Sequence, residues 1–262
     1  MKKIIFAVLV AILIGILALG LTGCVPGTWV KGNGQIETRD FPLTGFSRIE
    51  VYGTFNITVT QASDYKVSVT TSNNLFNYVE VDLVGDLLRI HPRPTVSFHM
   101  SDFKATVAMP ELIGFNISGA STGAISGFVA GSDTVLEVSG ASKLNISNVK
   151  FGDFAAEVNG ASVLNGTAYS NNINAEISGA STFELAGSAN AGTLNGSGAS
   201  SLRLSGFKVT NADVTLSGAS NCTIDVSGKL DAEVTGASRL IYSGNPVLGN
   251  VNVSGASTMK KQ

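Results

Sequence analysis

Three glutamates recur at a regular interval in the second half of this 262-residue chain: Glu137, Glu157 and Glu176. Each stands between two apolar residues, as an outward position of a strand does. If the three stack at the ~5 Å spacing of neighbouring strands, their charges repel one another unless a cation or a basic side chain intervenes. Because Ca²⁺ binds several carboxylate oxygens, these glutamates are candidate cation ligands. The alternative is a solvated face that pairs with Lys143 or other nearby charges.

The same carboxylates raise the question of an enzyme, since a glycosidase needs two of them ~5–10 Å apart. They lie in register with a repeat, however, and neither a basic or aromatic cluster nor a long insertion accompanies them. We therefore expect that the protein is not an enzyme and has no catalytic residue and no cofactor. We expect no metal ligands other than these three candidate glutamates. An enzyme of the parallel β-helix type that acts on carbohydrate is the alternative.

The repeat that carries the glutamates is marked by eight copies of Gly-Ala-Ser, spaced 18–21 residues apart. A period this regular indicates one short unit stacked on itself. We expect each tripeptide to form a corner between two strands, because glycine tolerates the backbone angles of a sharp bend. We expect the alanines to fill narrow interior space and the serines to form a hydroxyl ladder between turns. The corner glycines are Gly119, Gly140, Gly160, Gly179, Gly198, Gly218, Gly236 and Gly255.

On both sides of each corner, apolar and polar residues alternate with a period of two, which is typical of strands with one buried face. Strands at this spacing predict an all-β chain folded as a parallel β-solenoid of about 19–20 residues per turn. Ile49, Val51, Ile57 and Val59 repeat the pattern around Gly53. We therefore interpret 34–262 as one domain, with degenerate turns and a cap in 34–115 and regular repeats in 116–262. A separate small β-sandwich is the alternative for the first part.

The first 23 residues are of a different kind, with Lys2 and Lys3 before an apolar run. This is the layout of an export signal, and Leu21-Thr22-Gly23-Cys24 resembles the bacterial lipobox. We predict a lipoprotein signal peptide over 1–23, lipidation of Cys24 and a short tether over 24–33, with Trp29 at the membrane interface. An uncleaved membrane anchor is the alternative.

Charge and cysteine content narrow the partners further. With 17 basic and 19 acidic residues the chain offers no electrostatic case for nucleic acid. The second cysteine, Cys222, occupies an inward position, so we expect a buried thiol and no disulfide. Val25, which follows the predicted lipidation site, favours the outer membrane or cell surface, and the periplasmic face is the alternative.

Four segments add a family resemblance to the repeat: Gly32-Asn33-Gly34, Phe46–Val51, Leu87–Ile90 and Met109–Leu112. With them the chain resembles, over roughly residues 32–257, the bacterial GIN-domain family of "putative auto-transporter adhesin" heads, lipoproteins of unknown function. The resemblance implies a right-handed parallel β-helix at the cell surface or in the periplasm. It supplies no catalytic residues to transfer.

Together these features predict a membrane-anchored envelope lipoprotein that binds or scaffolds in the manner of an adhesin. Its expected partners are the membrane and a glycan or protein surface ligand. An open solenoid end exposes strand edges that must be covered, which predicts a cap from the N-terminal segment or a homodimer. The alternatives are an enzyme that acts on glycans and a periplasmic sensor or accessory protein.

Overall fold

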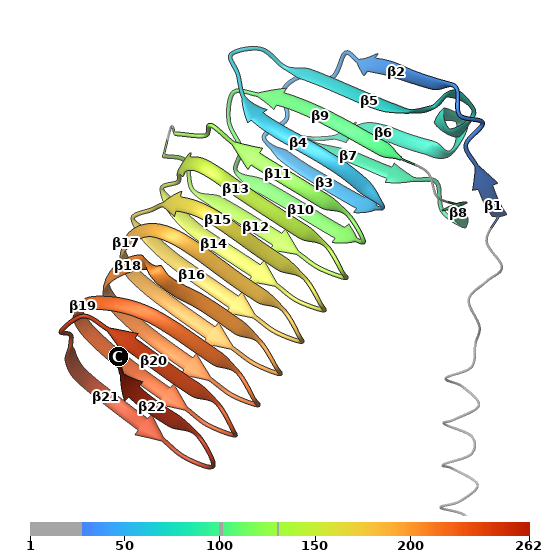
Figure 1. Cartoon of the computed structure of the whole chain (residues 1–262). Helices are drawn as coiled ribbons and strands as arrows, with labels where there is room; N and C mark the ends of the chain where they lie inside the picture. Colours follow the sequence, from blue (N-terminus) through green and yellow to red (C-terminus); the bar gives the residue numbers. More distant parts are fainter. Residues whose placement is uncertain (1–27, 100–101, 130) are drawn as a thin grey trace, which may run out of the picture.

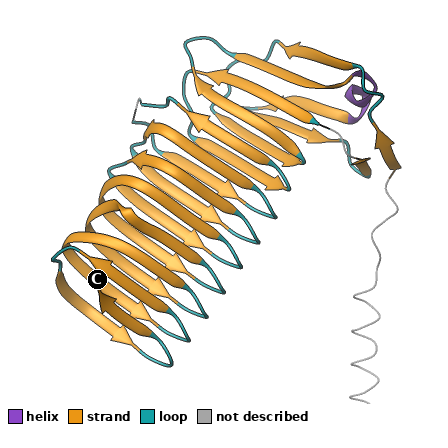
Figure 2. Cartoon of the chain, viewed as in Figure 1, coloured by secondary structure: helices purple, strands orange, loops and turns teal. Residues whose placement is uncertain are grey.

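The computed structural model describes residues 28–99, 102–129 and 131–262, and it shows a rod of strands stacked in parallel turns (Figure 1). Its one helix among these residues is a short 3-10 turn, η1 (Asn73–Tyr78), as the purple segment of Figure 2 shows. The predicted all-β solenoid is confirmed. The predicted signal peptide and Cys24 lie outside the described residues.

The rod has two long faces, which we name after their position relative to the corners. The upstream face contains the strands that lead into a corner, and the downstream face contains those that leave it. The upstream face is built, in order along the rod, from β7 (Leu87–Pro92), β3 (Arg48–Gly53), β10 (Gly114–Gly119), β12 (Thr134–Val138), β14 (Asp153–Val158), β16 (Asn172–Ile177), the second halves of three long strands, and β21 (Val247–Val253).

The downstream face runs beside it with the same parallel pairing. It is built from β9 (Phe103–Met109), β4 (Phe55–Gln61), β11 (Thr122–Ser126), β13 (Lys143–Lys150), β15 (Val163–Tyr169), the first halves of the long strands, β20 (Arg239–Ser243) and β22 (Thr258–Lys261). The long strands that bend from the downstream to the upstream face are β17 (Thr182–Gly196), β18 (Ser201–Leu216) and β19 (Asn221–Val234).

The corners of successive turns lie in one row. Each of the eight corner glycines has a positive φ of 70–83°. A Cβ added there would lie 2.4–2.8 Å from the carbonyl oxygen of the previous corner glycine, beginning with Gly53. The alanine that follows donates its backbone N–H to that same oxygen at 2.7–2.8 Å. Both the backbone angle and the close approach therefore require glycine.

The other two residues of the tripeptide divide between outside and inside. The alanines are exposed, so the expectation that they fill the interior was wrong, because the bend turns them outward. The serines of the first seven copies are buried. Their ladder consists mainly of backbone N–H groups bonded to hydroxyls, as from Ser121 to Ser142 at 3.3 Å and from Ser220 to Ser238 at 3.2 Å. The hydroxyls of Ser200 and Ser220 also bond to each other at 3.1 Å.

The core is a continuous column of apolar side chains inside the turns. Burial alternates along each strand, as in β16, where Ile173, Ala175 and Ile177 point inward and are at most 2% exposed. Cys222 lies in the same interior, and its burial raises the pKa of the thiol to about 12. A buried, protonated thiol behaves as a small hydrophobe.

The N-terminal part forms two rungs and an antiparallel cap. The rung β3–β4 lies between β10–β11 and the rung β7–β9, so chain order and spatial order differ. Beyond β7–β9, the strands β5 (Lys66–Ser72) and β6 (Val79–Val84) run antiparallel, and β2 (Ile36–Phe41) pairs with β5. These three strands therefore are not solenoid turns, and they cover the sheet edges that the first rung would otherwise expose.

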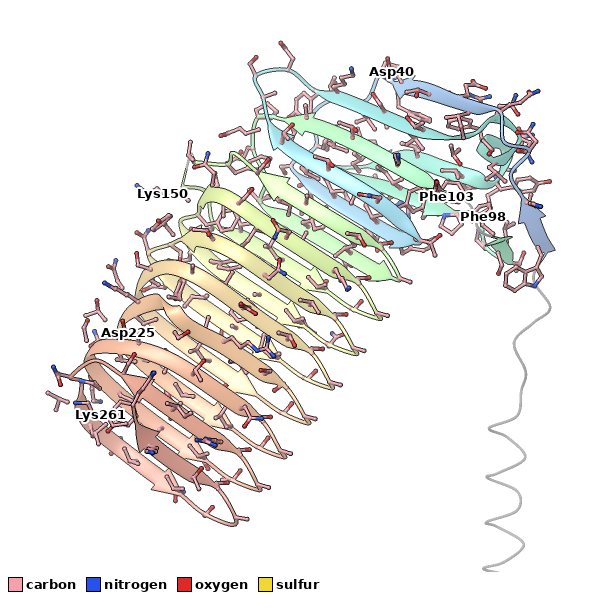
Figure 3. All side chains as sticks on the ribbon, in the orientation of Figure 1. Asp40, Phe98, Phe103, Lys150, Asp225 and Lys261 are labelled. Atoms are coloured by element: carbon pink, nitrogen blue, oxygen red, sulfur yellow. The ribbon has the colours of Figure 1, made fainter. Side chains whose placement is uncertain are left out.

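A small two-stranded sheet adjoins the cap. Strand β1 (Thr28–Lys31), which falls within the predicted tether, pairs in parallel with β8 (Val96–His99). Val30 and Phe98 pack against the core, and the ring centroids of Phe98 and Phe103 are 4.4 Å apart (Figure 3). The described chain thus begins on an ordered strand at the capped end of the rod.

Candidate functional site

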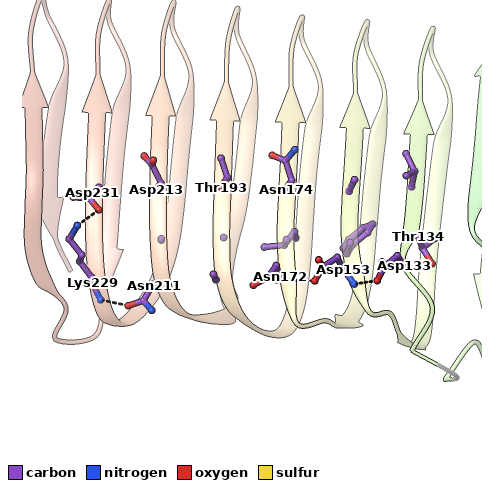
Figure 4. A pocket seen from close by; sticks show the side chains of 17 residues that line it. Asp133, Thr134, Asp153, Asn172, Asn174, Thr193, Asn211, Asp213, Lys229 and Asp231 are labelled. Atoms are coloured by element: carbon purple, nitrogen blue, oxygen red, sulfur yellow. Dashed lines mark hydrogen bonds and ion pairs between the residues drawn. The ribbon is translucent and has the colours of Figure 1, made fainter.

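The upstream face carries a groove of about 540 Å³ that extends across six rungs. Two rows of outward side chains flank it, as Figure 4 shows. The first row contains Asp133, Asp153, Asn172, Asn211 and Lys229, and the second contains Asn174, Thr193, Asp213 and Asp231. The rows occupy the positions seven and five residues before a corner glycine, so the repeat itself places them in line.

Small outward residues lower the walls of the groove near its centre, where Ala155 stands in the second row. The residues between the two rows point inward, and among them Gly192 and Ala212 stand where neighbouring rungs have Phe154 and Ile173. Ala191 also replaces the polar residue of the first row there. The groove therefore combines a shallow apolar floor with polar walls, which is the usual composition of a binding site.

Bonds between rungs hold the polar walls in place. Asp133 accepts the backbone N–H of Asp153 at 2.7 Å, and Asp153 in turn accepts the side-chain amide of Asn172 at 2.9 Å. Asn211 accepts the backbone N–H of Lys229 at 3.0 Å. Because these side chains of the first row are bonded to a neighbouring rung, this wall is already ordered before a ligand arrives, which lowers the entropic cost of binding.

The groove carries net negative charge from four aspartates against one lysine. That lysine, Lys229, lies 2.7 Å from Asp231 and lowers the pKa of this carboxyl by hydrogen bonding, with a further contribution from the backbone N–H of Asn250. Asp231 is therefore ionised at neutral pH. The surface favours ligands that present hydrogen-bond donors or positive charge.

The three predicted glutamates lie beside the groove on the same face. Glu137 pairs in register with Glu157, and Glu157 with Glu176. Side-chain amides contact the first two, from Asn116 to Glu137 at 2.6 Å and from Asn159 to Glu157 at 3.1 Å.

Whether these glutamates bind a cation stays a prediction. Across the described ranges, no three His, Cys, Asp or Glu side chains are grouped closely enough to hold a metal ion. Lys143, the suggested basic partner, lies on β13 of the downstream face and makes none of the ion pairs found in this part of the chain. Instead Glu157 and Glu176 line a smaller hollow of about 210 Å³.

The downstream face differs because the charges that line its hollow are paired. It has a hollow of about 730 Å³ where Asn145 donates to Asn165 at 2.8 Å and Arg203 contacts Glu184 at 3.3 Å. The upstream groove is therefore the better candidate site, since its charge is largely uncompensated.

The groove residues were not predicted from the sequence, although a signal exists. Continuing the alignment to seven residues before each corner gives Asp133, Asp153 and Asn172 in consecutive copies. The corner glycines, by contrast, line neither hollow of the upstream face between β12 and β19. They position the groove without contributing to its surface.

Comparison with known proteins agrees with this architecture. Residues 45–246 match the family described as "putative auto-transporter adhesin, head GIN domain". A "putative adhesin" from Parabacteroides merdae ATCC 43184 superimposes with a TM-score of 0.82 at 19% identity, covering 89% of this chain and 99% of that one. A "putative lipid binding protein" from Parabacteroides distasonis ATCC 8503 superimposes with a TM-score of 0.81 at 18% identity. The match covers 90% of this chain and 100% of that one.

A third solved structure, a "putative adhesin" from Bacteroides fragilis NCTC 9343, gives a TM-score of 0.71 at 17% identity, covering 89% of this chain and 100% of that one. At these identities the likeness shows a shared fold. The comparison with curated proteins gave no match. Within the ranges that the structure covers, no helix is both long and apolar enough to cross a bilayer.

Proposed function

Because the chain belongs to the GIN-domain family of adhesin-like proteins, we propose that it is a lipid-anchored envelope protein that binds an extended ligand along its upstream groove, without chemistry. The family supports a role at the cell surface or in the envelope. The observation that carries the proposal is the groove itself, whose polar side chains lie in two rows along six rungs and are bonded between rungs in the first row.

The spacing of the groove favours a linear ligand. Rungs stack at ~4.8 Å, so donors and acceptors recur along the rod at that interval. A glycan chain or an extended polypeptide segment is long enough to contact several rungs at once, whereas a compact small molecule would contact only one or two. Solenoids commonly bind through such elongated surfaces.

Filling the groove should weaken ligand binding. Thr193 is an exposed outward residue on the central rungs, and Thr193→Tyr would place a ring over the hollow floor. We expect at least roughly tenfold weaker binding to any glycan or matrix protein recovered on arrays, because close packing at a site centre dominates affinity. Surface plasmon resonance measures the change.

The matched control is Thr122→Tyr, an exposed threonine on β11 of the downstream face. It should bind as the unmodified protein does. Equal binding by both variants would place the ligand site elsewhere. Release of reducing sugar ends by the unmodified protein during incubation with polysaccharides would contradict a role without chemistry.

The proposal of lipid anchoring is based on the sequence around Cys24. Substitution of each of the two cysteines of the chain tests it directly. Cys24→Ser should remove incorporation of labelled palmitate and shift the protein from the membrane fraction to the soluble fraction. Cys222→Ala is the matched control, because that thiol is buried and far from the leader in sequence. Cys222→Ala should keep both the palmitate label and the membrane association. If Cys24→Ser also keeps both, the lipid anchor is contradicted.

A further inference from the structure

The first described strand holds the single tryptophan of the chain on its outer side. Along β1, Val30 points to the core, while Trp29 and Lys31 lie on the opposite side and are exposed, Trp29 to 70%. Alternation along the strand puts the indole and the ammonium group on one face. An exposed tryptophan beside a lysine is unusual on a soluble surface and typical of residues at a membrane interface.

This strand is fixed to the cap. Asn33 donates its backbone N–H to Asn74 at 3.0 Å and its side-chain amide to Asn73 at 2.7 Å. Asn74 donates back to the carbonyl oxygen of Lys31 at 2.9 Å. Together with the pairing of β1 and β8, these bonds fix the direction in which Trp29 points relative to the rod.

The predicted anchor lies within short reach. Trp29 follows Cys24 by five positions in the sequence, so a fully extended chain spans at most ~18 Å between them. An acyl chain on Cys24 holds that residue at the headgroup level, and Trp29 is therefore close enough to reach the same level. At the headgroup level an indole finds both apolar and polar surroundings, and a lysine finds anionic headgroups.

We infer that the outer face of β1, formed by Trp29 and Lys31, is a second contact with the lipid surface, which holds the capped end of the rod against the membrane. The inference rests on the lipid anchoring proposed above. Because the rod extends away from the cap, as Figure 1 shows, the groove and the last rung β21–β22 then lie farther from the bilayer. The anchor alone would leave the rod free to lie in any direction.

The single tryptophan makes the contact directly measurable. The lipidated full-length protein is incorporated into vesicles of phosphatidylcholine and phosphatidylglycerol, with and without bromine on the acyl chains. We expect the emission of Trp29 to shift to the blue and to be quenched by the brominated lipid. The matched control combines Trp29→Phe with Tyr169→Trp, which moves the indole to an exposed position on β15 in the middle of the rod. Its emission should be neither shifted nor quenched.

Vesicle flotation separates the two proposals. Protein that floats with the vesicles while Trp29 stays unquenched would overturn the membrane contact and leave the anchor intact. If the indole of the control variant is quenched as strongly as Trp29 of the unmodified protein, the rod lies flat on the membrane. That result would overturn the upright orientation. Protein that fails to float would overturn the anchor and this inference with it. Addition of Lys31→Glu should weaken the quenching in vesicles with phosphatidylglycerol more than in phosphatidylcholine alone.

Discussion

Replacing Phe183 with alanine should lower the free energy of unfolding by about 3–5 kcal/mol, the usual cost of removing a buried aromatic side chain. Phe183 lies on β17 in the middle of the rod and is 0% exposed. It stands in register with Leu164 on the preceding rung and Leu202 on the following one. In a solenoid each rung is stabilised through its two neighbours, so the cavity weakens both interfaces at once. Urea denaturation followed by circular dichroism measures the loss.

The neighbouring residue provides the control for this variant. Glu184 points outward on the same strand, and its ion pair with Arg203 is exposed. Glu184→Ala should change the free energy of unfolding by no more than about 0.5 kcal/mol. A loss of less than about 1 kcal/mol for Phe183→Ala would contradict a tightly packed interior.

The second large effect is expected at the corners, where Gly179→Ala should lower the free energy of unfolding by about 2–3 kcal/mol. Gly179 has a φ of +71°, which is unfavourable for alanine, and the added Cβ would lie 2.4 Å from the carbonyl oxygen of Gly160. That oxygen also accepts the N–H of Ala180, so relief of the clash lengthens a hydrogen bond between rungs. The shift in thermal midpoint measures the effect.

Two controls separate the causes of this effect. Gly34 has a similar φ of +81° but nothing within 4 Å of an added Cβ, so Gly34→Ala should cost only the backbone term, about 1 kcal/mol. Ala180→Ser changes the exposed neighbour and should be nearly neutral. Equal losses for Gly34→Ala and Gly179→Ala would show that the close approach between corners contributes nothing.

The regular half of the fold was predictable because it repeats one local rule. Alternation of apolar residues around eight equally spaced glycines specifies strands, corners and stacking together, and the pairing of Glu157 with Glu176 is the register that this alignment gives. The orientation of the corner alanines was not predictable by the same means, because composition does not reveal which side of a bend faces outward.

The cap and the groove depend on relations that a repeat does not encode. Strands β5 and β6 alternate apolar and polar residues as solenoid strands do, yet their direction is set by the loops and by η1 between them. The groove lies where the outward residues Ala155 and Ala191 are smaller than their polar counterparts on neighbouring rungs, and this local difference has meaning only once the rungs are stacked. The regular spacing of charge in the sequence points instead to the glutamates beside the groove.

The two ends of the rod are unlike, and this limits how copies of the protein can join. At the capped end, β5 and β6 pair with the first rung and leave it covered. At the other end, β21 exposes Val247, Leu248, Val251 and Val253 by 72%, 47%, 41% and 40%, in a part of the rod with no further strand upon it. Head-to-tail growth into filaments needs two complementary ends. β5 and β6 run antiparallel to the first rung, whereas β21 and β22 run parallel to the strands they pair with, so the two described ends of the rod present different edges and do not continue one another as successive turns do.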